Sequence, residues 1–303
     1  MRDRHLYLLL KEKVKKWRES GYPCEDYSII SEILEYSVIS SSAKEKSLRC
    51  LRTAQLEALE VYWYLRLVER TPYIFDLYKK FYLNQIELLK VLGIPTENED
   101  ILSLALNKGI DGIIEKIRAD NEFVKKCKLD ATKESLALNY PSYIFALAMG
   151  AGKTVLIGAI IATEFAMALE YPQNANFVKN ALVFAPGKTI LGALKEISDV
   201  PYKKILPERL YKEFITSVKF TYTRDGEKDI PIIKGSSFNI IVTNTEKIRI
   251  RKESIRKSML GGLFGNHERE EKAKELIANQ RLQTIASLPN LAIFSDEAHH
   301  TYG

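Results

Sequence analysis

The chain has 303 residues, of which 46% are hydrophobic and 28% are charged. That composition is typical of a soluble globular protein with a sizeable core. Lysine and arginine together (45) exceed aspartate and glutamate (39) by six, so the chain is mildly basic. This excess is compatible with a polyanionic partner but is too small to require one.

The cysteines and the hydropathy pattern exclude several other classes. The three cysteines are odd in number and too far apart for a metal site, which indicates a reducing compartment without a disulfide framework. The basic N-terminus encloses only a short apolar run and lacks a small-residue cleavage site, unlike a secretory signal. The longest apolar stretch, Val155–Leu169, is interrupted by Glu164 and is too short to span a bilayer. We therefore expect a cytoplasmic protein with no membrane partner.

The first 128 residues carry helical patterns. Apolar residues recur at helical spacing over residues 4–40, which predicts short amphipathic helices. A longer helix without glycine or proline is predicted over Leu48–Glu69. The same spacing continues over Tyr73–Lys128, with turns expected near Gly93 and Gly109. This part of the chain should form a small all-helical unit.

The pattern then changes to short apolar runs, each followed by a loop and in most cases by a helical stretch. Such runs alternating with helices predict an α/β fold with a mostly parallel sheet that is covered on both faces. The four runs are Tyr143–Met149, Ala181–Ala185, Phe238–Thr243 and Leu291–Ser295.

A glycine-rich segment, Leu147–Thr154, lies between the first predicted strand and a long apolar helix. This is the context that a phosphate-binding loop requires. Gly150 and Gly152 let the backbone bring its N–H groups close to phosphates, and the helix adds its positive end. Lys153 would reach the β- and γ-phosphates, and the Thr154 hydroxyl would ligate Mg²⁺. The predicted ATP-binding residues of this loop are Met149, Gly150, Ala151, Gly152, Lys153 and Thr154.

The alternative is a chance Gly-Lys-Thr tripeptide in an ordinary loop. Leu147 stands where the strict pattern has its first glycine, although the two glycines nearest the lysine do most of the cradling. The chain offers its own example of chance occurrence at Gly187–Thr189, because Ala185 stands where the inner glycine should be. We do not interpret that second tripeptide as a phosphate loop.

An acidic pair, Asp296 and Glu297, follows the last predicted strand. Ligands of open α/β sheets bind at the carboxyl ends of the strands, so this pair could face the phosphate loop. Asp296 would then hold Mg²⁺, and Glu297 would orient and deprotonate the attacking water as the catalytic base. A solvated Asp-Glu pair with no role is the alternative.

Asp-Glu-Ala-His after an apolar strand, with Gly-Ala-Gly-Lys-Thr upstream, resembles the DEAD/DEAH-box side of the superfamily-two helicases. The likeness extends in particular to the Res-type ATPase subunit of type III restriction systems and covers about residues 48–303. It implies a RecA-like ATPase lobe that hydrolyses ATP with Mg²⁺ while it grips DNA, with RNA as the alternative track. A helical N-terminal segment, residues 1–47, would precede the lobe, and a helical insertion over residues 71–138 would interrupt it.

The resemblance also implies contacts with the nucleic-acid backbone at two strand ends. Short hydroxyl, amide and N–H groups suit phosphate contacts, which position a nucleic acid without reading its sequence. An ordinary strand-end turn is the alternative for each segment. The residues concerned are Pro186, Gly187, Lys188, Thr189, Thr243, Asn244 and Thr245.

Two further nucleotide contacts follow from the resemblance. Leu51–Ala58 resembles the glutamine-bearing helix that contacts adenine, with Gln55 as the candidate, because an amide both donates to and accepts from a base edge. A plain surface glutamine is the alternative. His299 falls on the histidine of the acidic motif, which is implied to bond toward the γ-phosphate side or a second lobe. A metal site at His299 and His300 lacks further ligands nearby.

The sequence stops at Gly303, directly after the acidic motif. A motor of this type needs a second RecA-like lobe, whose arginines typically contribute a factor of about 10³–10⁵ in rate. We therefore expect residues 1–303 alone to bind ATP weakly, to hydrolyse it slowly and not to unwind duplexes. The rival interpretation is a nucleotide-controlled switch or clamp without processive motor activity. A scaffold that has lost catalysis is a third, against which Lys153, Thr154, Asp296 and Glu297 argue.

Overall fold

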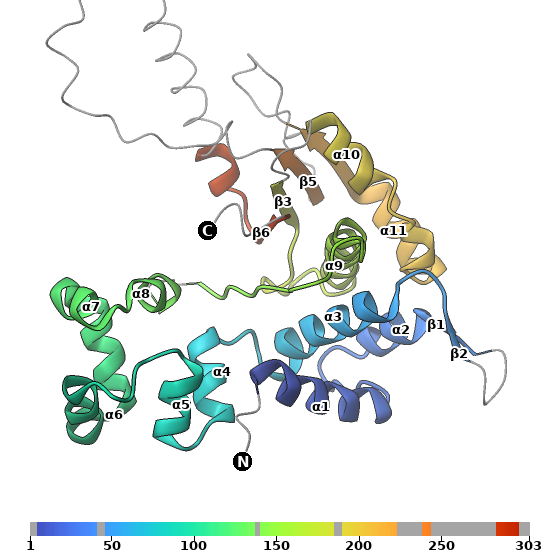
Figure 1. The fold of residues 1–303 in the computed structure, drawn as a ribbon. Coiled ribbons are helices and arrows are strands. Elements are labelled where there is room, and N and C mark those ends of the chain that lie inside the picture. The colour runs from blue at the N-terminus through green and yellow to red at the C-terminus, as the bar shows by residue number, and fades with distance from the viewer. Residues whose placement is uncertain are drawn as a thin grey trace, which may run out of the picture. The chain divides into compact units, whose positions relative to one another are not determined.

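The chain divides into two compact units, which are described separately. One unit, the helical unit, consists of residues 1–24 and 60–146, and the other, the sheet unit, consists of residues 25–59 and 147–303 (Figure 1). The computed structural model describes residues 5–40, 46–136, 140–184, 190–222, 238–243 and 283–296.

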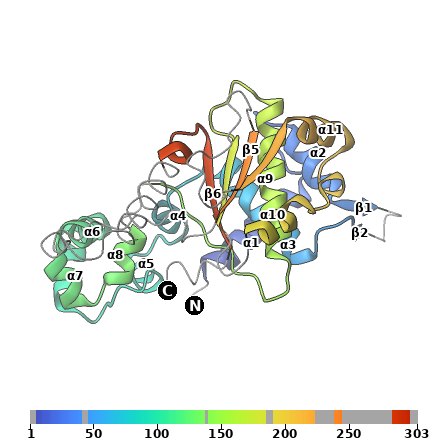
Figure 2. The same cartoon turned by 90° about the horizontal axis from the view of Figure 1, so that it is seen from above.

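Among the described residues, the sheet unit contains a sheet of four parallel strands in the order β4-β5-β3-β6 (Figure 2). β3 and β5 lie in the middle and are almost entirely buried, which explains their continuous apolar sequences. Three of the four predicted apolar runs are therefore strands, and the α/β fold with a parallel sheet is confirmed. The strands are β3 (Asn180–Phe184), β4 (Val218–Tyr222), β5 (Phe238–Thr243) and β6 (Leu291–Ser295).

The prediction of a strand over Tyr143–Met149 is wrong. Residues 141–148 form neither a helix nor a strand, and no described strand pairs with them. Ile144 and Met149 are 76% and 96% exposed, so an apolar composition alone did not place these side chains in a core. A strand exists only where a neighbour supplies the hydrogen bonds of a ladder.

Helices cover both faces of the sheet. α9, α10 and α11 lie on one side, and a helical segment described over residues 283–286 lies on the other (Figures 1 and 2). On that second side Ile285 packs against Leu182 of β3 and Ile241 of β5. The remaining helices of this unit and a small antiparallel hairpin precede the sheet in the chain. The elements are α2 (Ile29–Tyr36), β1 (Val38–Ser40), β2 (Lys46–Leu48), α9 (Lys153–Glu170), α10 (Ile190–Ser198), a 3₁₀ turn (Tyr202–Lys204) and α11 (Glu208–Ser217).

α9 is the central helix of the sheet unit, and all its residues from 158 to 168 are buried. In its second half, Phe165 packs against Phe238, the first residue of β5, with ring centroids 5.2 Å apart. The carboxylate of Glu164 accepts a hydrogen bond from the N–H of Val178, just before β3. The second half of α9 therefore lies at the amino ends of the strands. It follows that its first turn, which begins at Lys153, is directed toward their carboxyl ends.

The helical unit confirms the helical patterns predicted over its sequence. The expected turn at Gly93 is present, with a φ of 69°, and Gly109 kinks α6 with a φ of 68° and a ψ of −171°. Such a positive φ is accessible to glycine at little steric cost. The helices are α1 (Leu6–Glu19), α4 (Ile74–Phe81), α5 (Gln85–Val91), α6 (Glu99–Ala119), α7 (Asn121–Cys127) and α8 (Asp130–Leu136).

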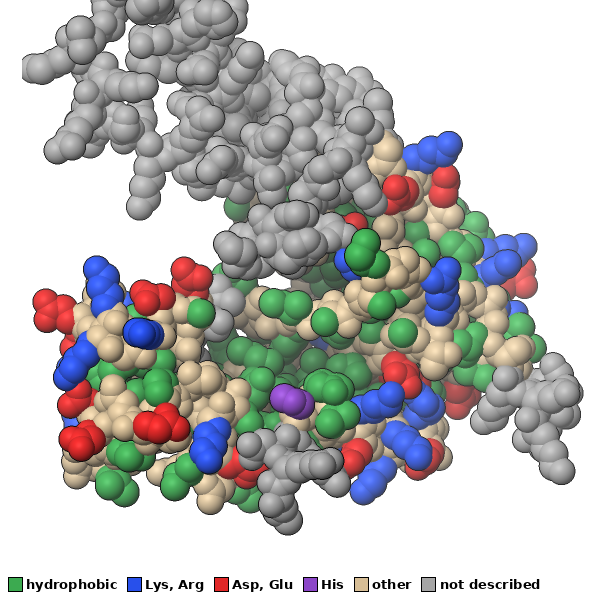
Figure 3. All heavy atoms as spheres, in the orientation of Figure 1, with side chains coloured by type: hydrophobic (Ala, Val, Ile, Leu, Met, Phe, Trp, Pro, Cys, Tyr) green, Lys and Arg blue, Asp and Glu red, His purple; other side chains and the backbone are tan. Residues whose placement is uncertain are grey.

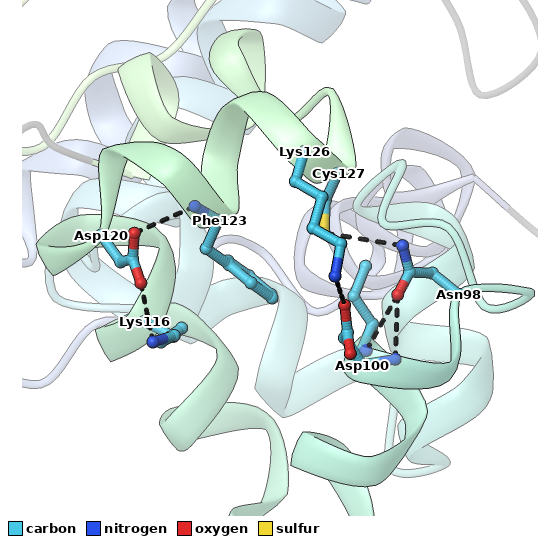
Figure 4. Close-up of polar contacts among 8 residues, drawn as sticks. Asn98, Asp100, Lys116, Asp120, Phe123, Lys126 and Cys127 are labelled. Atoms are coloured by element: carbon cyan, nitrogen blue, oxygen red, sulfur yellow. Dashed lines mark hydrogen bonds and ion pairs between the residues drawn. The ribbon is translucent and has the colours of Figure 1, made fainter.

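Side-chain caps define the starts of α6 and α7 (Figure 4). Asn98 accepts hydrogen bonds from the second and third N–H groups of α6, and Asp120 does the same for α7. Lys126 of α7 pairs with Asp100 of α6, and Lys116 pairs with Asp120 at 2.7 Å. Positive and negative side chains are interspersed over these helices on the face that Figure 3 shows. That face of α6 and α7 therefore has the mixed charges of a solvated surface rather than a basic patch.

α3 (Thr53–Trp63), continued by a π-helical turn over Tyr64–Val68, passes from the sheet unit into the helical unit. The helix predicted over Leu48–Glu69 thus begins later than expected, because Leu48 belongs to β2. No helix among the described residues is both long and apolar enough to cross a membrane.

A buried ionic network lies at the start of the helical unit. Glu60 of α3 is fully buried and forms a bidentate pair with the guanidinium of Arg18, whose Nε lies 2.6 Å from Oε1. The phenol of Tyr22 donates a hydrogen bond of 2.6 Å to the same oxygen of Glu60. Burial and the neighbouring carboxylate raise the pKa of the Tyr22 phenol. No sequence pattern predicted this network.

Candidate nucleotide site

The glycine-rich loop leads directly into the amino terminus of α9. Gly150 and Gly152 have φ values of 72° and 80°, in the left-handed region that favours glycine. Gly152 is the N-cap residue of α9, and no side chain among the described residues caps this helix. An uncapped helix start presents backbone N–H groups and the positive end of the helix dipole, which together favour an anion.

Two side chains, those of Arg52 directly before α3 and of Gln55 in its first turn, donate hydrogen bonds to backbone carbonyls of this loop. The Gln55 amide nitrogen donates to the carbonyl oxygens of Ala151 at 2.9 Å and Gly152 at 2.8 Å. One Arg52 guanidinium nitrogen donates to the carbonyl oxygen of Gly150. The Gln55 amide oxygen in turn accepts a hydrogen bond of 2.7 Å from the backbone N–H of Arg52. Gln55 is 2% exposed, so it is not a surface glutamine.

Gly152 has a second reason to be glycine. A Cβ atom at this position would lie 2.5 Å from the amide nitrogen of Gln55, a separation that side chains do not tolerate. The positive φ would add backbone strain of about 1 kcal/mol or more. We expect Gly152→Ala to displace Gln55 and to weaken binding of a fluorescent nucleoside triphosphate about tenfold or more. Gly93→Ala, which shares the positive φ but meets no atom within 4 Å, is the matched control and should leave this affinity unchanged.

The predicted Mg²⁺ ligands lie on different elements of the sheet unit. The Thr154 hydroxyl lies 3.4 Å from a carboxylate oxygen of Glu196 on α10. Asp296 directly follows β6, is buried, and its N–H donates to the carbonyl oxygen of Phe184 at 3.0 Å. Asp296 thus lies at the carboxyl end of the sheet, toward which the first turn of α9 is directed. Hydroxyl and carboxylate oxygens are the ligand types that Mg²⁺ prefers.

Sequence reasoning missed Arg52 and Glu196. Arg52 lies three residues before Gln55 and directly before α3, the spacing at which a side chain in the first helical turn accepts a hydrogen bond from the backbone N–H of the residue that precedes the helix. That spacing is a signal that could have found Arg52 once Gln55 was proposed. Glu196 lies 42 positions from Thr154, and no motif connects the two residues.

Thr243 ends β5 and is fully buried, and its contact with a nucleic-acid phosphate stays a prediction. The other predicted residues of the nucleic-acid and catalytic sites lie outside the described part of the chain and stay predictions. They are Pro186, Gly187, Lys188, Thr189, Asn244, Thr245, Glu297 and His299.

Comparison with known families agrees with this arrangement. The family model of the type III restriction enzyme, Res subunit, matches residues 116–303, which include the glycine-rich loop, all four strands of the sheet and the acidic motif. The chain belongs to the Res-subunit family. No curated protein and no solved structure matches it.

The predicted family is thus confirmed, and with it the α/β fold of the N-terminal lobe of superfamily-two helicases. At the level of the family, Res subunits are helicase-like ATPases of restriction systems. The match begins within α6, so the helices before it and the Arg52–Gln55 turn lie outside the part that identifies the chain as a Res subunit.

Proposed function

We propose that this chain is the ATP-hydrolysing motor lobe of a DNA helicase or translocase of a type III restriction system. The observation that carries the proposal is the glycine-rich loop with two positive φ values, directly before the uncapped start of the buried helix α9. Its occurrence in a Res-family chain supports a triphosphate as the anion. DNA as the track and a cytoplasmic location stay predictions.

In this proposal one set of groups in the chain binds the triphosphate and another activates the attacking water. N–H groups at the start of α9 and the ammonium of Lys153 bind the β- and γ-phosphate oxygens. Glu297 orients a water molecule and accepts its proton as the water oxygen attacks the γ-phosphorus. The bond from that phosphorus to the β–γ bridging oxygen breaks, and ADP and inorganic phosphate leave.

Thr154 and Asp296 would hold Mg²⁺, because a hydroxyl and a carboxylate offer the oxygen ligands that this ion prefers. The ion, when bound, supplies positive charge that offsets the charge of the phosphate oxygens. Glu196 lies beside the Thr154 hydroxyl and adds a second carboxylate to this neighbourhood. A second RecA-like lobe would complete the γ-phosphate side with arginines.

The variant Glu297→Gln separates binding from chemistry. We expect it to retain the affinity for a fluorescent ATP analogue and to lose the release of inorganic phosphate by about two orders of magnitude, because the general base is removed. Wild-type turnover is expected to be slow. Phosphate release should therefore be followed under single-turnover conditions with excess protein. Unchanged phosphate release by Glu297→Gln would refute the role of this carboxylate.

Nucleic-acid dependence distinguishes the motor from the rival switch or clamp. A motor lobe in its full-length parent should hydrolyse ATP faster when DNA is added, and the stimulation should decrease with added salt because phosphate contacts release counterions. ATP binding that is indifferent to single-stranded DNA, duplex DNA and RNA would favour the switch.

A further inference from the structure

We propose that Arg52 and Gln55 form a brace that fixes the orientation of the phosphate loop, so that both act as positioning residues for triphosphate binding. This inference rests on the proposed function for its consequence, but the brace itself is defined by contacts within the sheet unit. The carbonyl oxygens of three consecutive loop residues accept hydrogen bonds from Arg52, directly before α3, and from Gln55 in the first turn of that helix. These loop residues are Gly150, Ala151 and Gly152.

Because the peptide bond is planar, these carbonyl contacts also determine where the backbone N–H groups of the loop point. In a trans peptide the C=O and the following N–H point in opposite directions. Because the carbonyls of Ala151 and Gly152 point at Gln55, the N–H groups of Gly152 and Lys153 point away from α3. These are the N–H groups that lead into the first turn of α9 and that a phosphate would meet. The brace thus fixes the orientation of backbone N–H donors that belong to the loop and not to the side chains of Arg52 and Gln55.

The hydrogen-bonding capacity of Gln55 separates this role from adenine recognition. A glutamine amide nitrogen has two N–H donors, and here this nitrogen donates to two loop carbonyls. To donate to a base edge, Gln55 would have to release one of these carbonyls. A brace therefore predicts equal effects on ATP and GTP, whereas an adenine contact predicts an effect on ATP alone.

Hydrogen–deuterium exchange tests the brace without nucleotide. Gln55→Glu keeps the shape of the side chain but replaces two donors with an acceptor that the loop carbonyls repel. We expect backbone amides in the peptide that covers residues 147–156 to exchange about tenfold faster in this variant. Arg52→Ala, at an exposed position where folding is not at risk, should have the same direction of effect, and Arg52→Lys should restore part of the protection.

Gln173→Glu introduces the same change at an exposed position in the loop after α9 and is the matched control. Its exchange over residues 147–156 should equal that of the wild type. Affinities for fluorescent ATP and GTP analogues give the second measurement, and Gln55→Glu should weaken both by the same factor of about ten.

The outcomes are distinct. Unchanged exchange in both Gln55→Glu and Arg52→Ala would overturn the brace. Loss of ATP affinity with retained GTP affinity would also overturn it and would assign Gln55 to the base. If the wild type bound neither nucleotide while exchange still rose in the variants, the proposed function would fail and the brace would stand as a determinant of loop conformation.

Discussion

Replacing Lys153 with alanine is expected to reduce the affinity for nucleoside triphosphates about a hundredfold or more. Lys153 is the first residue of α9 and follows the two positive-φ glycines, so its ammonium accompanies the N–H groups that would surround the phosphates. Removing a cation from such a preorganised site typically lowers affinity or rate by about two to three orders of magnitude. Binding of a fluorescent ATP analogue measures the effect independently of slow turnover.

Two other lysine variants serve as comparisons for Lys153→Ala. Lys195→Ala removes an exposed charge from the last turn of α10 and should leave triphosphate affinity unchanged. Lys188→Ala alters the second Gly-Lys-Thr tripeptide and should weaken nucleic-acid binding while triphosphate affinity is retained. Lys153→Arg keeps the charge but not the compact ammonium, so we expect only partial recovery. Equal affinities for Lys153→Ala and the wild type would exclude this loop as the triphosphate site.

Replacing Arg18 with alanine is expected to lower the free energy of unfolding of the helical unit by about 3 kcal/mol. Glu60 is fully buried, and the loss of its cationic partner leaves an uncompensated carboxylate, which typically costs about 3–5 kcal/mol. We expect the lower end of that range because the Arg18 side chain is 41% exposed. Urea denaturation followed by tryptophan fluorescence is a suitable measurement, since both tryptophans, Trp17 and Trp63, are buried in the helical unit.

The matched control is Lys15→Ala, which removes an exposed ion pair with Glu19 on the same helix and should change the stability by less than about 1 kcal/mol. The double variant Arg18→Met, Glu60→Leu should recover most of the loss, because two apolar side chains leave no buried charge. A loss as large as that of Arg18→Ala in this double variant would show that packing, not charge, is responsible.

The Tyr22 phenol gives the same network a pH dependence. Its pKa is raised in the folded state, mainly by burial. The unfolded chain therefore loses this proton first, above a pH of about 10. Stability from the neutral phenol is fully present below that pH and decreases as the pH rises further. Tyr22→Phe should flatten the stability curve of the helical unit above this pH.

Sequence patterns predicted the central strands of the sheet because burial on both faces requires continuous apolar runs, as in β3 and β5. They failed where pairing, not composition, decides the outcome. Tyr143–Met149 is as apolar as a buried strand but pairs with no described strand. β4 alternates polar and apolar residues and directly follows α11 at Ser217, so no turn residue announced it.

The glycine-rich loop and its lysine could be found from the sequence because their chemistry is local. The partners of the loop could not, because Gln55 and Ala151 are 96 positions apart and only the folded chain brings them together. The family resemblance singled out Gln55 but assigned it to a base, whereas its amide nitrogen donates to backbone carbonyls of the loop. Arg52 and Glu196 carry no motif of their own, and their proximity to the loop is a property of tertiary structure.

The path of α3 through both units limits how the polypeptide can be shortened. The chain passes between its two units near residues 24, 59 and 146, and the second passage lies within this helix. Excising residues 60–146 would shorten α3 to Thr53–Leu59, a stub below the length at which helices persist without support. The same deletion would remove Tyr64, an aromatic neighbour of Trp17. A minimal polypeptide with an intact glycine-rich loop is therefore expected to require the helical unit as well.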